Sequence, residues 1–141
     1  MRETMFASMM IPHHQQAIEL SDLALKISKN PEVLQLAKEI KAAQAPEIEE
    51  MKLWGDVDTN MHSGHVMSGM LSEDELAALR KATGVEFDRA FLTGMIMHHQ
   101  GAIEMAQSII NSRNHEVSSL ARAIISTQKA EIERMKIILA K

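Results

Sequence analysis

The 141-residue chain contains one sequence pattern twice. Residues 6–22 align on residues 91–107 with 9 identities in 17 positions, and residues 30–54 align on 114–138 with 12 in 25. Half of the compared positions are identical, which indicates a tandem duplication with copies at 6–54 and 91–138. This period is too long for a solenoid of short repeats. At this length we expect a single domain over residues 1–141.

Each copy has the pattern of two helices joined by a short turn. Apolar side chains recur at three- and four-residue intervals, the spacing of a buried helix face, over residues 6–27, 31–54, 91–110 and 114–138. Asn30 followed by Pro31 is typical of a helix start, and Asn114 holds the same place in the second copy. Two antiparallel hairpins predict an all-α fold, a four-helix bundle.

The connection between the copies, residues 55–71, is longer than most loops in a compact domain. A short extra helix is expected after it, because Ser72 and Glu75 form a capping box before Leu76, and Gly84 is expected to end that helix. We expect the long link to cross the bundle lengthwise and leave the two copies' histidines at opposite ends. A shorter return would bring them together.

The most distinctive repeated phrase carries two adjacent histidines with methionines just upstream. Histidine and methionine side chains at this spacing meet on one helix face. A single pair is more often one buried and one surface histidine, but the repetition with methionine favours metal binding. The candidate ligands of this phrase are Met9, Met10, His13 and His14 in the first copy, and Met95, His98 and His99 in the second.

A second repeated phrase lies on the partner helix of each hairpin. If each hairpin turns where expected, this phrase comes level with the histidines, within about a helical turn of 5.4 Å. Met51 and Met135 are then further candidate ligands. The remaining polar members are expected to orient the imidazoles by hydrogen bonds; they are Gln44, Glu47, Gln128 and Glu131.

The donor types narrow the metal. Neutral thioether and imidazole ligands suit soft Cu(I), with Ag(I) as a surrogate, whereas zinc favours cysteine, histidine and carboxylate, and calcium and magnesium favour oxygen. The chain has twelve methionines against three phenylalanines, one tryptophan and no cysteine. Methionine also fills irregular cores, so any single methionine carries little weight away from the histidines.

The connection carries a third group of soft ligands: Met61, His62, His65, Met67 and Met70. A loop with spare ligands suits acquisition of an ion or its delivery to a copper-transfer partner protein. The alternative is a flexible linker with incidental residues. His115 stands at a helix start and is expected at the surface.

Several functional classes are disfavoured. A formal net charge of −4 and no dense basic run argue against nucleic-acid binding, and no stretch approaches the roughly 20 apolar residues of a membrane span. No Glu-x-x-His pair indicates a di-iron centre, and no nucleophile motif indicates a hydrolase, so we expect no enzyme activity. Residues 1–11 lack the apolar core of a signal peptide, which leaves a cytoplasmic protein or one whose export signal has been removed. The oligomeric state stays open.

The chain resembles the family called domain of unknown function 305 from about Phe6 to Leu139. Its most specific matches are residues 10–19, 44–51, 69–72, 87–88 and the second His-His-Gln. The resemblance implies a ferritin-like duplicated four-helix bundle that binds copper in the periplasm or elsewhere outside the cytoplasm. The alternative is a non-metal helical interaction module whose methionines form an adaptable binding surface.

Overall fold

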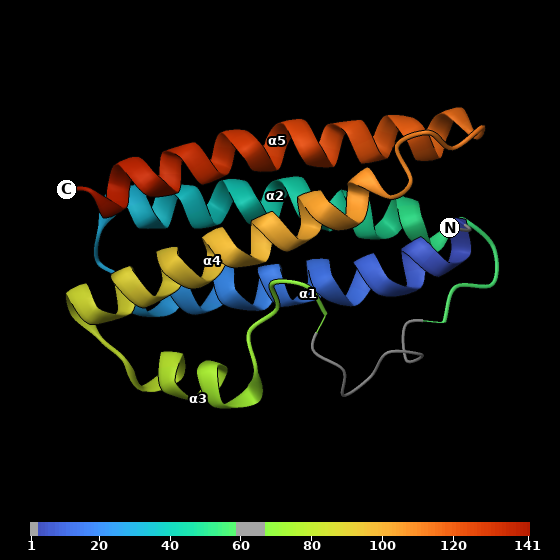
Figure 1. The fold of residues 1–141 in the computed structure, drawn as a ribbon. Coiled ribbons are helices and arrows are strands. Elements are labelled where there is room, and N and C mark those ends of the chain that lie inside the picture. Colours follow the sequence, from blue (N-terminus) through green and yellow to red (C-terminus); the bar gives the residue numbers. More distant parts are fainter. Residues whose placement is uncertain (1–2, 59–66) are drawn as a thin grey trace.

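The computed structural model describes residues 3–58 and 67–141, and its described residues form an all-helical bundle (Figure 1). The helices in chain order are α1 (Glu3–Ile27), α2 (Pro31–Lys52), α3 (Glu73–Lys81), α4 (Gly84–Gln107) and α5 (His115–Leu139). The pairs α1/α2 and α4/α5 form the two hairpins, with the short α3 between them. The predicted fold class is confirmed.

The four long helices form a closed ring in which α1 contacts α2 and α4, and α5 contacts the same two helices. α2 ends at one end of the bundle and α4 begins at the other (Figure 1). The link from the end of α2 to the start of α4, which includes α3, therefore joins opposite ends of the bundle, as expected. Its consequence is that α1 and α4, the two histidine-bearing helices, lie antiparallel and in contact.

Helix starts follow the sequence signals. The Asn30 side chain accepts a hydrogen bond from the Glu32 backbone N–H, and Asn114 does the same at the start of α5. Ser72 and Glu75 form the predicted capping box. Each such cap satisfies backbone donors that the first turn leaves without partners and is typically worth about 1 kcal/mol.

The predicted start of the fourth helix was wrong. α4 begins at Gly84, seven residues before Phe91, because Phe87 is also buried and its ring stacks on Phe91 with centroids 5.9 Å apart. Gly84 does not end α3, which already stops at Lys81. It adopts a φ of 60° where α4 begins, a conformation that glycine reaches without steric cost.

The apolar core is divided into two clusters along the bundle axis. One gathers around Leu20, Leu36, Phe91 and Met135, and the other gathers around Phe6, Met51, Met105 and Ile124. In each long helix the residues of one cluster precede those of the other, with buried polar residues between them in the sequence. A polar layer therefore crosses the interior where the two clusters meet.

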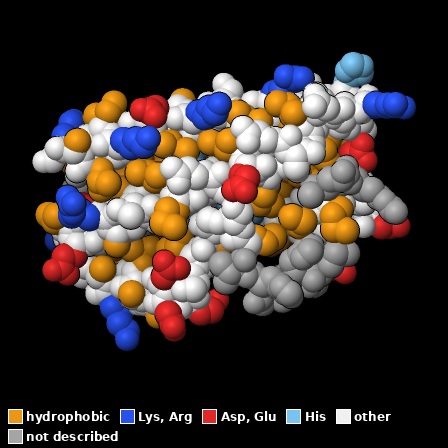
Figure 2. Space-filling model, in the orientation of Figure 1, with side chains coloured by type: hydrophobic (Ala, Val, Ile, Leu, Met, Phe, Trp, Pro, Cys, Tyr) orange, Lys and Arg blue, Asp and Glu red, His pale blue; other side chains and the backbone are white. Residues whose placement is uncertain are grey.

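Charged side chains are scattered over the molecular surface. On the face shown in Figure 2, acidic and basic groups are dispersed among apolar patches and gather into no single block. Surface pairs such as Arg80–Glu19 and Lys41–Asp22 join neighbouring helices, each worth little because solvent screens it. Among the described residues, no helix is both long and apolar enough to span a bilayer.

Candidate metal centre

Six buried polar residues, one or two from each long helix, occupy the boundary between the two core clusters. We call them the histidine layer: His13 and His14 of α1, Gln44 of α2, His98 and His99 of α4, and Gln128 of α5. All four histidine side chains are 0% exposed. Proteins rarely bury such a group of polar side chains away from water unless it has partners.

The two histidine pairs meet inside the bundle. The rings of His13 and His98 have centroids 3.8 Å apart, and those of His98 and His99 are 6.4 Å apart. The expectation that a lengthwise crossover would leave the pairs at opposite ends is therefore wrong. His13 and His98 each lie well inside a helix, at similar distances from one end of the bundle, so antiparallel packing of α1 and α4 brings them level.

Carboxylates on the partner helices hold two of the imidazoles. His14 Nε2 lies 2.7 Å from Glu47 Oε1, and His99 Nε2 lies 2.7 Å from Glu131 Oε1. These are the carboxylates that the hairpin register placed at this level. Because a carboxylate accepts, each Nε2 donates, and Nδ1 is left with its lone pair in a neutral ring.

His13 is held by the connection between the repeats. Its Nε2 donates to the backbone carbonyl of Ser68 at 2.8 Å, which also leaves Nδ1 as the nitrogen with a free lone pair. His98 differs, because neither of its ring nitrogens makes a hydrogen bond of ordinary geometry with any described residue. The four rings are therefore not equivalent, although the sequence around them is duplicated.

Burial keeps His13 and His98 neutral. The loss of hydration lowers the pKa of His13 from 6.5 to about 4, against the opposing effect of the Ser68 hydrogen bond. Burial lowers the pKa of His98 well below 6.5, and the neighbouring His13 adds to this effect. Neutral imidazole is the form that ligates a metal.

The described interior concentrates its missing hydrogen bonds here. Eleven buried side-chain polar atoms lack a partner among the described residues, and nine belong to the histidine layer, including both amide atoms of Gln44 and of Gln128. Each such atom typically costs about 1–3 kcal/mol when it is left without a partner. A layer of this kind therefore fits a ligand, an ion or ordered water that supplies partners.

The predicted methionine ligands flank the histidine layer. Met10 and Met51 belong to the core cluster on one side, and Met95 and Met135 belong to the cluster on the other. All four are 0% exposed. Met9 is half-buried and packs against the same cluster as Met10.

The connection contributes only part of its predicted ligand group to the described structure. Met67 and Met70 are half-buried and close a tight turn through a 2.9 Å backbone hydrogen bond. Met61, His62 and His65 lie outside the described residues. His115 is exposed, as expected.

Within residues 3–58 and 67–141, no three histidine, aspartate or glutamate side chains converge into an arrangement ready to hold an ion. The donor set nevertheless fits a soft metal, because unpartnered imidazole nitrogens have thioethers in the adjoining clusters. Holding an ion there requires thioether ligands, small ring movements, or both.

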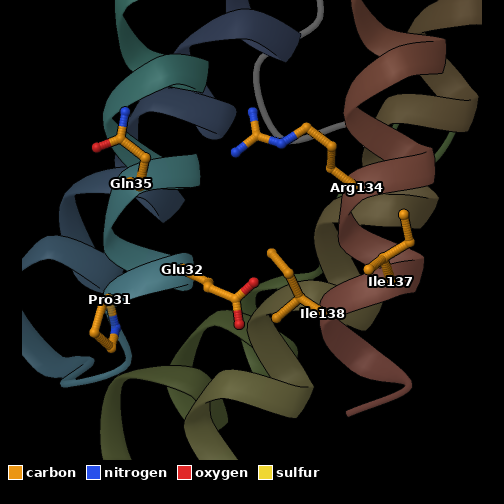
Figure 3. A pocket seen from close by; sticks show the side chains of 6 residues that line it. All are labelled: Pro31, Glu32, Gln35, Arg134, Ile137 and Ile138. Carbon is orange, nitrogen blue, oxygen red and sulfur yellow. The ribbon is translucent and has the colours of Figure 1, made fainter.

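A surface groove at one end of the bundle is separate from this layer. It has a volume of about 280 Å³ and lies between the start of α2 and the end of α5, where Arg134 faces Gln35 across the opening (Figure 3). Its lining contains no histidine or methionine. It therefore contributes none of the predicted ligands.

Two polar partners of the centre were not predicted from the sequence. Gln16 was read only as part of the repeated phrase, yet its amide holds the backbone of Leu71. The Ser68 carbonyl that accepts the hydrogen bond from His13 is a backbone group, so the residue type at this position does not predict the contact. The one trace in the sequence is that Gln16 is replaced by Gly101 in the second copy.

A duplicated helical bundle with histidines buried between its hairpins is the class of protein that the fold and the site define. The chain belongs to the family described as domain of unknown function (DUF305), which matches residues 3–139. The resemblance seen in the sequence is therefore confirmed. A search of curated proteins finds no significant match.

Three solved structures illustrate the relationship. A DUF305 fragment from Deinococcus radiodurans shares 34% identity and a TM-score of 0.84, covering 98% of this chain and 95% of that one. A DUF305 protein from Streptomyces coelicolor, inferred to be secreted, shares 30% identity and a TM-score of 0.87, covering 96% and 90%. CopM in its Cu(II)-bound form shares 38% identity and a TM-score of 0.85, covering 98% and 95%. CopM also has Cu(I)-bound, Ag-bound and apo structures.

Proposed function

We propose that this protein binds copper, chiefly as Cu(I), through the histidine layer and the methionines on either side of it. Ag(I) is the expected surrogate, because it shares the preference for thioether and imidazole ligands. The observation that carries the proposal is the set of four buried imidazoles, each of which has at least one ring nitrogen without a partner among the described residues. The similarity to CopM, solved with copper and with silver, supports it.

The candidate ligands have distinct roles in this proposal. The Nδ1 atoms of His13, His14 and His99 and either nitrogen of His98 are the available imidazole donors, and Met10, Met51, Met95 and Met135 supply thioethers. Glu47 and Glu131 orient their histidines. Met61, His62, His65, Met67 and Met70 form a further group for capturing or passing on the ion.

The biological role that follows is non-catalytic copper sequestration, resistance or transfer outside the cytoplasm. The secreted relative from Streptomyces coelicolor is consistent with that location. A buried layer suits retention of the ion, and the ligands of the connection suit its exchange with a copper-transfer partner.

The competing function, a methionine-rich interaction surface, has less support. Met10, Met51, Met95 and Met135 are fully buried and present no surface. The exposed methionines of the described residues include Met5 and Met97, and neither is among the predicted ligands. An adaptable docking face needs its thioethers at the surface.

An anaerobic Cu(I) titration against a competing chelator tests the proposal. We expect sub-micromolar retention by the full chain and its loss when His13 and His98 are both replaced by asparagine. Replacement of the exposed His115 by asparagine is the matched control and should leave affinity unchanged. Retention no stronger than that of a scrambled Met/His peptide would refute the proposal.

A further inference from the structure

A segment of the connection, residues 68–71, is held between the two histidine-bearing helices. The Gln16 side chain of α1 clamps Leu71 in both directions: its Nε2 donates to the Leu71 carbonyl at 3.0 Å, and its Oε1 accepts from the Leu71 N–H at 2.9 Å. On α4, Ser68 Oγ donates to Glu104 Oε2 at 3.1 Å. The segment is therefore bound to both helices.

The approach to α4 is close enough to require glycine. A Cβ on Gly101 would lie 1.9 Å from the Ser68 carbonyl oxygen, and a Cβ on Gly69 would lie 2.2 Å from the Met97 carbonyl oxygen. Both contacts are backbone against side-chain carbon, so neither is relieved by a rotamer change. Gly69 also has a φ of 77°, which favours glycine.

The two repeats differ at the positions that this docking uses. Gln16 and Gly101 are equivalent in the alignment of the copies. The first copy supplies a side chain that grips the segment, and the second removes a side chain that would exclude it. If both copies had glutamine here, the side chain on α4 would exclude the segment; if both had glycine, α1 would lack the side chain that holds Leu71.

We propose that segment 68–71 is a positioning element that fixes His13 with its proton on Nε2, so that Nδ1 is the donor atom presented to a metal. It does for His13 what Glu47 and Glu131 do for His14 and His99, because a carbonyl oxygen, like a carboxylate, only accepts. Among the described residues, neither ring nitrogen of His98 has such a partner. The inference deepens the proposed copper function and rests on it only for its metal-binding consequence.

Two substitutions undock the segment by different means. Gly101→Ala places a methyl group against the Ser68 carbonyl, and Gln16→Ala removes the Leu71 clamp. Gln100→Ala, at the exposed position next to Gly101 on α4, is the control for the first. Gln15→Ala, at an exposed neighbouring position, is the control for the second.

The primary measurement needs no metal. Long-range ¹H–¹⁵N spectra of the imidazoles distinguish the Nε2–H and Nδ1–H tautomers, and hydrogen exchange reports the Leu71 amide. The unaltered apo protein should show His13 as the Nε2–H form with a protected Leu71 amide. In Gly101→Ala and Gln16→Ala we expect loss of that protection and a mixed His13 tautomer, with His14 and His99 unchanged. The controls should match the unaltered protein.

The second measurement is Cu(I) affinity by chelator competition. Loss of a group that orients a metal ligand typically costs about 10- to 100-fold in affinity, and we expect that range for both undocking variants. Each undocking substitution is also combined with His13→Asn. If the substitution acts only by releasing His13, the double variant should bind Cu(I) as tightly as His13→Asn alone, whereas a general structural defect would lower its affinity further.

The outcomes separate the two proposals. A His13 tautomer that stays Nε2–H when Leu71 loses protection overturns the positioning role, and so does a protected Leu71 in Gly101→Ala. An unaltered protein that shows the tautomers but binds no Cu(I) overturns the copper function and leaves the positioning of His13 standing. If Gly101→Ala does not fold, Gln16→Ala decides the same question.

Discussion

Acid should destabilise the apo protein through its buried histidines, and His13 allows the effect to be calculated. Its pKa is about 4 in the folded protein, against 6.5 when unfolded. Between these values the unfolded chain takes up a proton that the folded protein does not. Stability is therefore complete above pH 6.5 and falls as the pH drops toward 4.

The magnitude is large for one side chain. At 1.36 kcal/mol per pKa unit, the full shift corresponds to about 3.4 kcal/mol, of which about 2 kcal/mol is lost between pH 7.5 and pH 5. His98 adds to this in the same direction, since its pKa is also lowered by burial. Typical domains have only about 5–15 kcal/mol of stability in total.

Denaturant unfolding of the apo protein at a series of pH values is the assay. Carboxylates and other histidines also contribute to the pH dependence, so the informative quantity is the difference between variants. His13→Gln should flatten the fall between pH 7.5 and 5 by about 2 kcal/mol, whereas His115→Gln, at an exposed position, should leave it unchanged. Equal pH dependence in His13→Gln and the unaltered protein would refute the claim that His13 is buried neutral.

Three other predictions address the candidate centre and the fold. Met51→Leu should weaken Cu(I) binding at least tenfold while changing stability by less than about 1.5 kcal/mol. Met105→Leu replaces a buried methionine outside the predicted ligand set, and it should leave Cu(I) affinity unchanged with a similarly small change in stability. Equal affinities in the two variants would show that the thioether of Met51 is not a ligand. Glu131→Gln should lower Cu(I) affinity by about 10- to 100-fold, measured by chelator competition at pH 7.5, and unchanged affinity would exclude an orienting role. Asn114→Ala should cost about 1 kcal/mol in denaturant unfolding, because it removes the N-cap of α5, and a neutral result would mean that water replaces the cap.

The helices were predictable because their signals are local. Asn30 and Asn114 cap where the sequence places them, and the hairpin register brought Glu47 level with His14 because a short turn leaves little freedom in how two helices align. The start of α4 was predicted too far along the chain because the bounds of this helix were taken from the alignment with the first copy. The repeat alignment begins at Phe91, and the burial of Phe87 has no counterpart in that alignment.

The arrangement of the centre was harder to predict because it depends on contacts between the repeats. The sequence indicated two pockets, each within one hairpin. The contact of His13 with His98 depends on how far along α1 and α4 each histidine lies. The prediction that a lengthwise connection separates the two pairs did not take these positions into account. The Ser68 carbonyl belongs to the backbone, and no residue type indicates which backbone carbonyl will accept a hydrogen bond from a distant side chain.

The polar boundary between the two core clusters also bears on how the molecule assembles. Each hairpin contains mostly contacts between residues near in sequence, which form early in folding. The contacts made by His13 within this boundary join residues 55 to 85 positions apart, as in His13 with Ser68 and His13 with His98, and we expect them to form last. Neither hairpin alone can shield its imidazoles from water, so an ancestral single copy would have needed a second molecule to complete the layer. Gene duplication placed that second molecule on the same chain, and the connection that joined the copies became one of the partners of His13.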